Sequence, residues 1–398
     1  MKVLLAHCFY RSSAPSGEDS VYLSEKELLE SNGVDVIPLE KYNDCVNVTT
    51  FMNKVKTAKN TIWSKSAYDE ISQLIKHFKP DVAHFHNTFP QLSPSAYKAC
   101  YDNGVPVVQT LHNYRNICPG AMLLRNGKSC ELCLNGSIFP INSLMHKCYR
   151  NSISATAPLA LMIANSRLNG AYKNYVTRYI ALTEFAKDRF IRGGLESNKI
   201  AIKPNFLSID SEAELVKGNY AVFVGRLSDE KGIRTLLTSW SEVTNLKLKI
   251  LGDGHLRSVL EEYAAKSGID VEFMGFLPQK NVIKIVRKAM IQIIPSECYE
   301  GFPMSVLEAF ACGTPVIASR LGSLQEIVTD GDTGVLFEAA NSSDLAEKIN
   351  ALIKNSEKRM RISFNAKNVF DVKYSNDKNL DILMNIYNVS IEEMKAKS

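Results

Sequence analysis

The chain has 398 residues, of which 45% are apolar and 22% are charged, and its formal net charge is +5. This length predicts two or three domains, and the composition excludes collagen-like, low-complexity and disordered chains. The longest apolar stretch, residues 155–164, contains Pro158 and is too short to span a bilayer, so no transmembrane helix is expected.

The N-terminal residues and the cysteines indicate a cellular compartment. Residues 1–6 form a very short apolar run followed by His7, which is typical of a first strand and not of a signal peptide. The nine cysteines are an odd number in a chain without a secretion signal, which favours free thiols in a reducing cytosol. We therefore expect a cytoplasmic protein.

The first half of the chain alternates strands with helices. We predict strands at 2–8, 35–39, 81–86 and 105–110, helices at 20–31, 68–78 and 93–102, and a polar loop with helical pieces at 43–66. Strands separated by helices predict a parallel, doubly wound sheet.

The composition changes near residue 205, where Pro204 and Asn205 follow a predicted strand and a polar stretch begins. The second half alternates again, with strands at 220–225, 247–251, 271–274, 290–295 and 315–318, and helices at 232–242, 256–267, 281–289, 344–354, 358–370 and 377–395. We predict an N-terminal domain at 1–205 with a cysteine-containing insertion at about 113–150, a C-terminal domain at 206–375, and a terminal helical segment at 376–398.

The stretch from Ser296 to Ser319 organises the second half. Glu300 lies in a turn after a buried strand, and Pro303 suits the first position of a helix of about nine residues that ends before Gly313. The free N–H groups at such a helix start attract phosphate. Glu308 lies about five residues into the helix, which is roughly 8 Å along its axis from the helix start. The carboxylates of Glu300 and Glu308 therefore flank a site that is suited to a diphosphate between two sugars.

Glu300-Gly301-Phe302, Glu308-Ala309 and the run from Cys312 to Val316 resemble the E-x7-E signature of retaining glycosyltransferases of family 4. The structural alternative is a buried β-α-β unit with two solvated glutamates. The resemblance implies an α/β protein of the GT-B fold, with two Rossmann-like domains facing across a cleft. It implies that the domain at 1–205 lies on the acceptor side, that the domain at 206–375 binds the nucleotide sugar, and that the helix at 376–398 returns to the first domain. It implies donor contacts for Glu308, Gly17, Gly301, Phe302, Pro303, Met304, Phe276 and Leu277, and catalytic roles for Glu300, Arg226, Lys231 and His112.

Two cationic residues fit a metal-independent reaction. Gly225-Arg226-Leu227 and Glu230-Lys231-Gly232 resemble the family's G-R-L-x-x-x-K-G motif. Transfer from a nucleotide sugar leaves a diphosphate whose charge must be neutralised. The single D-x-D sequence, Asp330 to Asp332, is typical of a Gly-rich turn, so Arg226 and Lys231 are expected to replace a metal ion. No cofactor and no catalytic metal are expected.

The first domain contributes two further candidates. Ser16-Gly17-Glu18 is similar to the family's Gly-rich loop, although Ser replaces the first Gly, and a lone glycine in such a loop is most often only a turn. His112 follows a predicted strand at its carboxyl end, where the resemblance implies contact with the donor sugar or the acceptor. A buried histidine with satisfied hydrogen bonds is the alternative.

Four cysteines, Cys118, Cys130, Cys133 and Cys148, have the spacing C-x11-C-x2-C-x14-C. Four thiolates can make a closed zinc site, but a second C-x2-C is missing, so unligated thiols stay the leading alternative.

Residues 141–192 hold eight Lys or Arg and two acidic residues, with Tyr172, Tyr175 and Tyr179 among them. A basic, aromatic surface favours peripheral contact with anionic lipid at the inner face of the plasma membrane and a lipid-linked acceptor, and a solvated helical face is the alternative. Nucleic acid is not expected, because no recognition motif accompanies the charge.

The sequence therefore predicts a retaining glycosyltransferase that moves a hexose-type unit from a nucleoside-diphosphate sugar to a growing glycan. Bacterial surface polysaccharide synthesis (capsule, O-antigen or exopolysaccharide) is the expected setting. A GT-B nucleotide-sugar epimerase and a non-catalytic nucleotide-sugar-binding protein are the alternatives. A dinucleotide oxidoreductase is disfavoured because no G-x-G-x-x-G follows a strand.

Overall fold

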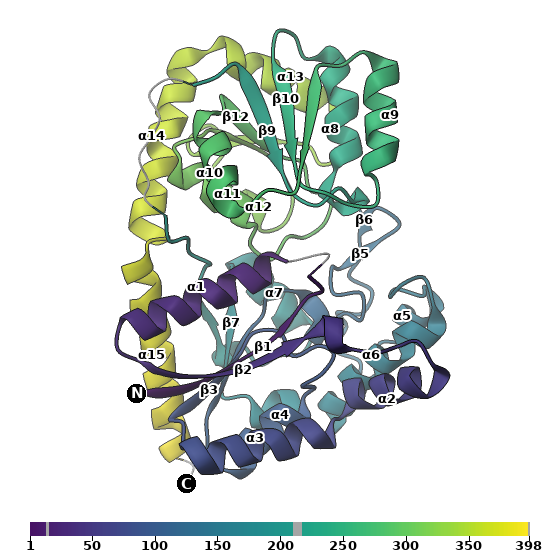
Figure 1. Cartoon of the computed structure of the whole chain (residues 1–398), viewed down its shortest axis with the longest axis vertical. Coiled ribbons are helices and arrows are strands. Elements are labelled where there is room, and N and C mark those ends of the chain that lie inside the picture. Colours follow the sequence, from purple (N-terminus) through teal and green to yellow (C-terminus); the bar gives the residue numbers. More distant parts are fainter. Residues whose placement is uncertain (13–15, 210–216, 397–398) are drawn as a thin grey trace. The chain divides into compact units, whose positions relative to one another are not determined.

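The computed structural model describes residues 1–12, 16–209 and 217–396. The chain forms two compact units (Figure 1). Unit 1 comprises Met1–Leu123, Cys130–Asn205 and Asn379–Ser398, and unit 2 comprises Leu124–Ser129 and Phe206–Lys378. Each unit contains a six-stranded sheet.

Unit 1 has a parallel sheet with the strand order β2-β1-β3-β4-β7-β8. Its strands are β1 Lys2–Phe9, β2 Asp35–Tyr42, β3 Val82–Phe85, β4 Val107–Thr110, β7 Arg178–Ala181 and β8 Ile200–Ile202. Its helices are α1 Gly17–Ser31, α2 Phe51–Ile62, α3 Lys65–Phe78, α4 Ser95–Asp102, α5 Ile141–Met145, α6 Ile153–Leu168, α7 Glu184–Arg192 and most of α15 Asn376–Lys395. The strand order reverses between β1 and β3, and open sheets of this kind bind ligands at the carboxyl ends of the strands beside such a point.

The C-terminal helix α15 completes the core of unit 1. Val3 and Leu5 lie on one face of β1, because alternate residues of a strand share a face. They pack in one cluster with Tyr22 of α1 and with Leu383 and Tyr387 of α15. Full burial of an apolar side chain contributes about 1.5–3 kcal/mol, so α15 is part of the fold of this unit and not an appendage.

Unit 2 has a parallel sheet with the order β11-β10-β9-β12-β13-β14, which is the strand order of a dinucleotide-binding Rossmann sheet. Its strands are β9 Tyr220–Val224, β10 Lys247–Leu251, β11 Val271–Gly275, β12 Ile291–Ile294, β13 Val316–Ser319 and β14 Gly334–Phe337, and a small hairpin joins β5 Leu124–Arg125 to β6 Lys128–Ser129. Its helices are α8 Ile233–Ser239, α9 Arg257–Ser267, α10 Gln279–Lys288, α11 Met304–Ala311, α12 Leu324–Ile327, α13 Ser342–Lys354 and α14 Ser356–Lys373. The order reverses between β9 and β12, which are hydrogen-bonded neighbours.

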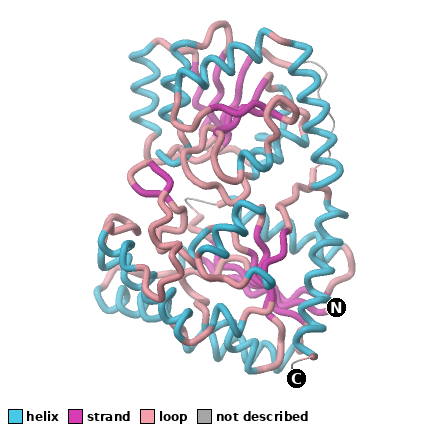
Figure 2. The backbone as a smooth tube through the Cα atoms, turned by 180° about the vertical axis from the view of Figure 1, so that it is seen from behind, coloured by secondary structure: helices cyan, strands magenta, loops and turns pink. Residues whose placement is uncertain are grey.

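The core of unit 2 joins β9, β10 and β12 to helices α8, α9 and α13. Phe223, Leu236 and Ile293 are at most 2% exposed within this cluster, which also contains Ile349 of α13. Figure 2 shows both sheets with helices against them. Within the described residues, no helix combines the length and apolar character needed to cross a membrane.

The sequence predicted a polar loop with helical pieces at residues 43–66, and the structure has a 12-residue helix there, α2. Thr50 caps this helix, and its side chain accepts a hydrogen bond from the N–H of Asn53 at 3.2 Å. The helical periodicity of α2 is hard to see in the sequence, because the apolar side chains of Phe51, Met52 and Val55 are exposed and do not form a buried stripe.

Candidate functional site

Two loops meet at the carboxyl ends of β9 and β12, beside the point where the strand order of unit 2 reverses. Gly232 has a φ of 65°, and a Cβ there would lie 1.8 Å from the carbonyl oxygen of Pro295. Only glycine permits this approach. The N–H of Glu297 also donates to the carbonyl oxygen of Glu230 at 2.9 Å. The two loops are therefore locked together by backbone contact.

This contact brings together the two predicted catalytic residues Lys231 and Glu300. Lys231 Nζ lies 2.6 Å from Glu300 Oε1, and the hydroxyl of Ser296 donates to the same oxygen at 2.6 Å. Burial opposes ionisation of Glu300, but Lys231 and Ser296 outweigh it and hold the pKa of Glu300 below its usual range. Burial likewise opposes the charge of Lys231, and Glu300 outweighs it and raises the pKa of Lys231. The pair is therefore fully charged at neutral pH.

Arg226 lies in the same loop as an exposed cation. The loop is held by backbone contacts, since Gly225 donates its N–H to Leu251 at 3.0 Å and a Cβ on Gly252 would lie 1.9 Å from the carbonyl oxygen of Gly225. Arg226 has no ion-pair or hydrogen-bond partner among the residues that the structure describes. Its charge also favours the ionised form of Glu300. The side chain is thus available to an anionic ligand.

Helix α11 begins at Met304. The sequence predicted Pro303 at the first helical position, and in the structure Pro303 is instead the N-cap residue directly before the helix. Glu308 is 7% exposed, and burial raises its pKa to about 7, although a hydrogen bond from Gln279 opposes that shift. Phe302 is buried and its ring packs against that of Tyr374 at 5.6 Å between centroids. Glu308 is therefore a carboxyl group poised to change its charge near neutral pH.

The remaining donor-binding candidates of unit 2 lie in loops next to these elements. Gly301 and Met304 are half-buried beside the N-cap of α11. Phe276 is 66% exposed and Leu277 is half-buried in the loop between β11 and α10. An aromatic ring this exposed is suited to stack on a flat ligand. The donor-binding roles of these residues remain predictions.

Asp330 and Asp332 lie in a turn, as the sequence predicted. Asp330 accepts hydrogen bonds from the N–H of Leu336 at 3.0 Å and from Arg320 at 2.6 Å. Asp332 accepts a hydrogen bond from Asn365 at 2.7 Å. Both carboxylates therefore have structural partners.

In unit 1, a pocket opens beside the switch point between β1 and β3. Its polar lining includes Glu18, His86, Asn87, His112, Asn113 and Arg115. His112 follows β4 and is 9% exposed, and its Nε2 lies 2.9 Å from Nδ1 of His86. Gly17 is the exposed first residue of α1, after the N-cap residue Ser16, and its ligand role remains a prediction.

Sequence reasoning missed Glu25 and Lys203, and it named Glu18 only as part of the Gly-rich loop without a role of its own. Glu18 accepts a hydrogen bond from Asn113 at 2.8 Å, while its other oxygen is buried without a partner among the described residues. Burial raises the pKa of Glu18. Glu25 and Lys203 form a buried ion pair at 2.7 Å although they are 178 positions apart. Their sequence context carries no motif, so only the fold reveals them.

The four cysteines of the proposed zinc site belong to unit 1 and are half-buried free thiols. A Cβ on Gly120 would lie 3.7 Å both from Cys118 Sγ and from Cys148 Cβ, so these two cysteines are close. Burial raises the pKa of Cys133 to about 12, and the nearby thiols of Cys118, Cys148 and Cys130 add smaller shifts in the same direction. The four thiols thus gather in one region, and zinc binding remains a hypothesis.

The basic segment at 141–192 does not form the aromatic surface that the sequence suggested. Tyr172 and Tyr179 are buried, at 6% and 0% exposure. Tyr179 is a core residue of strand β7, and Tyr172 lies in the short helical segment Ala171–Tyr175, which packs against α4 and α6. Its arginines are partly neutralised, since Arg189 and Arg192 pair with Glu131 and Arg178 pairs with Glu393. The prediction is therefore wrong for Tyr172 and Tyr179, while Tyr175 is half-buried.

Two family models match most of the chain between them. Residues 38–211 match the model described as Glycosyltransferase Family 4, and residues 207–369 match the model described as Glycosyl transferases group 1. Among curated proteins, an uncharacterized glycosyltransferase of Methanocaldococcus jannaschii is 32% identical over 226 residues, which are 55% of this chain and 62% of that protein. The phosphatidyl-myo-inositol mannosyltransferase of Mycobacterium leprae is 28% identical over 220 residues, which are 52% of this chain and 58% of that protein. The chain thus spans about three-fifths of the length of these two relatives.

Solved structures resemble the whole chain. The sucrose-phosphate synthase of Thermosynechococcus elongatus aligns with a TM-score of 0.72 at 15% identity and covers 100% of both chains. The Anabaena protein HepE, solved in complex with UDP, aligns with a TM-score of 0.67 at 16% identity and covers 98% of this chain and 100% of its own. This likeness confirms the predicted α/β fold of GT-B type.

Proposed function

This chain belongs to the glycosyltransferases that join a Glycosyltransferase Family 4 region to a Glycosyl transferases group 1 region, and from that premise we propose that it transfers a sugar from a nucleoside-diphosphate sugar to a glycan. We propose that the reaction retains the anomeric configuration and needs no metal ion. The family resemblance seen in the sequence is confirmed by the two matches, while the reaction itself is our proposal.

The proposed reaction breaks the bond between C1 of the sugar and the β-phosphate oxygen, and the electron pair stays on the diphosphate. The acceptor hydroxyl forms the new bond to C1 on the same face, and its proton passes to the departing phosphate. Lys231 and Arg226 would neutralise the charge that develops on the diphosphate, as preorganised cations do in many enzymes. Glu300 would hold hydroxyls of the transferred sugar, and Glu308 would hold the ribose.

The observation that carries this proposal is the charged Lys231–Glu300 pair at the switch point of unit 2. A lysine ammonium and a carboxylate stand 2.6 Å apart at the carboxyl ends of β9 and β12, with the exposed Arg226 in the same loop. Parallel sheets of this strand order bind nucleotides at that position. The start of α11 follows Glu300 by four residues and adds a phosphate-attracting helix end.

A nucleotide screen followed by product analysis tests the proposal. We expect UDP, GDP or ADP to raise the melting temperature of the protein, because a ligand that binds only the folded state stabilises it. The corresponding nucleotide sugar should then release its nucleoside diphosphate only when an acceptor is added, and NMR of the product should show retention. Conversion of the donor alone would instead identify an epimerase, and binding without any conversion would identify a nucleotide-sugar-binding protein.

We further propose that the acceptor is lipid-linked and that the enzyme rests on the cytoplasmic face of the membrane during bacterial surface polysaccharide synthesis. The support comes from the α2–α5–α6 corner, which we define as residues 51–62, 141–145 and 153–168. Helices α2 and α5 both pack against α6 (Figure 1). The corner holds Lys54, Lys56, Lys59 and Arg167 and no acidic residue.

Apolar side chains of this corner are exposed to an unusual degree. Phe51 and Met52 are each 80% exposed, and Met145 is 69% exposed. Exposed apolar residues mixed with lysines are typical of surfaces that insert into the headgroup region of anionic bilayers. This corner takes the place of the tyrosine-containing surface that the sequence suggested.

A further inference from the structure

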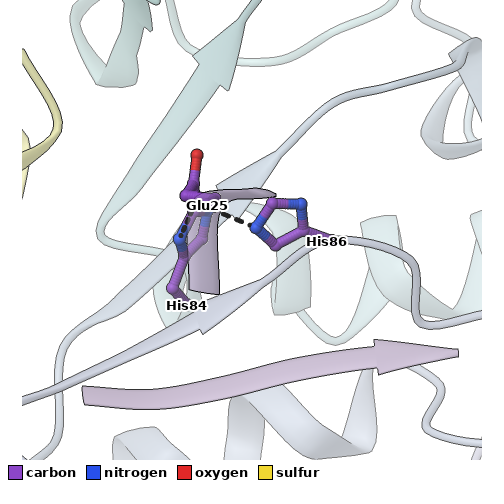
Figure 3. A group of neighbouring side chains, drawn as sticks. All are labelled: Glu25, His84 and His86. Atoms are coloured by element: carbon purple, nitrogen blue, oxygen red, sulfur yellow. Dashed lines mark hydrogen bonds and ion pairs between the residues drawn. The ribbon is translucent and has the colours of Figure 1, made fainter. Parts of the chain in front are cut away.

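Unit 1 contains a buried chain of polar side chains that ends at His112. Lys203 Nζ donates to Glu25 Oε2 at 2.7 Å, Glu25 Oε1 lies 3.0 Å from Nε2 of His86, and Nδ1 of His86 lies 2.9 Å from Nε2 of His112. Figure 3 shows Glu25 of α1 joined by dashed lines to His84 and His86, which lie at the carboxyl end of β3. Lys203, Glu25 and His86 are at most 3% exposed, so water does not compete for these contacts.

Glu25, His84 and His86 are close enough to hold a metal ion, with ligand atoms within 4.8 Å of one another. Their ligand atoms already have protein partners. Lys203 neutralises the carboxylate, and the two ring nitrogens of His84 lie 2.7 Å from the hydroxyl of Tyr387 and 2.8 Å from that of Thr110. We therefore interpret the group as a hydrogen-bonded ion pair and not as a metal centre.

The charges of the chain decide which ring nitrogens carry protons. Burial opposes the charge of Glu25, but Lys203 and the two histidines outweigh it and hold the pKa of Glu25 well below its usual range. Burial lowers the pKa of His86 to about 3 and the pKa of His112 well below its usual range, so both rings are neutral. An ionised carboxylate can only accept hydrogen bonds, so Nε2 of His86 must donate and its Nδ1 must accept. The proton between the two rings then belongs to Nε2 of His112.

We propose that Glu25 and His86 are positioning residues that fix His112 in its Nε2–H tautomer, so that its Nδ1 accepts a hydrogen bond from a hydroxyl group of a bound sugar. This inference rests on the proposed function for the identity of the ligand. Nδ1 is the ring nitrogen of His112 that has no hydrogen-bond partner among the described residues. The opposite tautomer would present an N–H at the same place and would repel a donating hydroxyl.

The surrounding pocket supports a ligand with several hydroxyl groups. His112 and Glu18 line the same pocket, and one carboxyl oxygen of Glu18 is buried without a partner among the residues described. Burial raises the pKa of Glu18, and an oxygen of a carboxyl group accepts hydrogen bonds whether the group is ionised or not. An acceptor nitrogen and a carboxyl group in one pocket can accept hydrogen bonds from two hydroxyl groups of one sugar.

NMR of the histidine rings tests the proposal without any substrate. The chain has seven histidines, so selective ¹⁵N-histidine labelling gives few signals, and two-bond correlations distinguish the two tautomers. We expect the Nε2–H form of His112 in the wild-type protein. We expect the same form in His86→Asn, whose amide oxygen can replace Nδ1 of His86 as the acceptor, and a mixture of tautomers in His86→Leu. Transfer should fall by about tenfold in kcat/KM for His86→Leu and be largely restored in His86→Asn.

His84→Gln is the matched control, because His84 also contacts Glu25 but does not contact His112. It should lower the melting temperature and leave the tautomer of His112 unchanged. An Nδ1–H tautomer of His112 in the wild type, or an equal change of tautomer in His84→Gln, would overturn the proposal. The NMR result stands even if the protein transfers no sugar, so the failure of this inference and the failure of the proposed function can be told apart. Glu25→Gln is avoided because it leaves Lys203 buried without its counter-charge.

Discussion

Lys231 Nζ lies 2.6 Å from Glu300 Oε1, and this pair joins loops that are 69 positions apart in the sequence. The two side chains are 25% and 11% exposed, so solvent screens the pair only in part. Because Glu300 has a lowered pKa and Lys231 a raised one, the pair stabilises the fold above the ordinary pKa of a carboxyl group. That contribution is lost when the pH falls through the lowered pKa of Glu300 or rises through the raised pKa of Lys231.

Lys231→Ala should reduce turnover at saturating donor by at least about tenfold, because it removes a preorganised cation from the departing diphosphate. Steady-state kinetics, with circular dichroism to verify the fold, measure the effect. Lys247→Ala is the matched control, since Lys247 also pairs with a glutamate, Glu272, at 3.1 Å but on the surface. Turnover near the wild-type value in Lys231→Ala would refute the phosphate role.

Glu308 should release a proton when the nucleotide binds. Burial raises its pKa to about 7, and ribose hydroxyls that donate to its carboxylate would favour the ionised form. Calorimetry at pH 7 in buffers of different ionisation enthalpy should show about half a proton released per nucleotide, and none in Glu308→Gln. Glu262→Gln, on the exposed surface of α9, is the control. Equal heats in all buffers for the wild type would contradict this assignment.

The raised pKa of Glu308 also predicts how stability depends on pH. The folded protein holds this proton more tightly than the unfolded chain, whose carboxyl has an ordinary pKa of 4.5. The contribution of Glu308 to the free energy of unfolding should therefore decrease as the pH rises from about 4.5 to about 7 and then stay constant. Glu308→Gln should remove this part of the pH dependence in urea unfolding.

Turnover should be independent of divalent metal ions. Prolonged chelator treatment should leave the rate unchanged, because Arg226 and Lys231 supply the positive charge. Asp330→Asn should lower the melting temperature, since Asp330 pairs with Arg320 and accepts from the N–H of Leu336, but should not change turnover. A reversible loss of activity on chelation would overturn the metal-independent mechanism.

The α2–α5–α6 corner should bind anionic membranes. The wild-type protein should sediment with vesicles that contain anionic lipid, less with zwitterionic vesicles, and less at high salt. A Phe51→Ser, Met52→Ser double variant should bind about tenfold more weakly, because two exposed apolar side chains no longer enter the bilayer. The control is Met360→Ser with Phe364→Ser on α14, where the side chains are 66% and 67% exposed. Equal loss in both variants, or no binding by the wild type, would contradict the proposal.

Metal analysis of protein purified without chelator tests the zinc hypothesis. Four thiolates bind one zinc ion, so a content near one per chain is expected if Cys118, Cys130, Cys133 and Cys148 are ligands. Cys133→Ser should then abolish zinc binding, while Cys45→Ser, at an exposed cysteine in another part of unit 1, should not. A content under about 0.2 per chain would exclude the site.

The sequence alone determined features that depend on short spacings. The alternation of strands and helices, the turn at Glu300, the helix that follows Pro303 and the glycine-containing loop around Arg226 are local patterns, so they were predicted close to where the structure has them. The length of helix α2 was missed because its exposed apolar residues give no buried stripe. The buried positions of Tyr172 and Tyr179 were missed because a count of charged residues does not locate buried strands.

Tertiary structure decided which of these local features meet. The contact of Gly232 with Pro295 depends on β9 and β12 being neighbours, although β10 and β11 lie between them in the chain. The chain from Lys203 through Glu25 and His86 to His112, and the contact of His84 with Tyr387 across 303 positions, depend in the same way on strand order and on the docking of α15. Local periodicity carries no information about strand order, because any order satisfies the same alternation of apolar residues, and only the packing of the whole unit selects one.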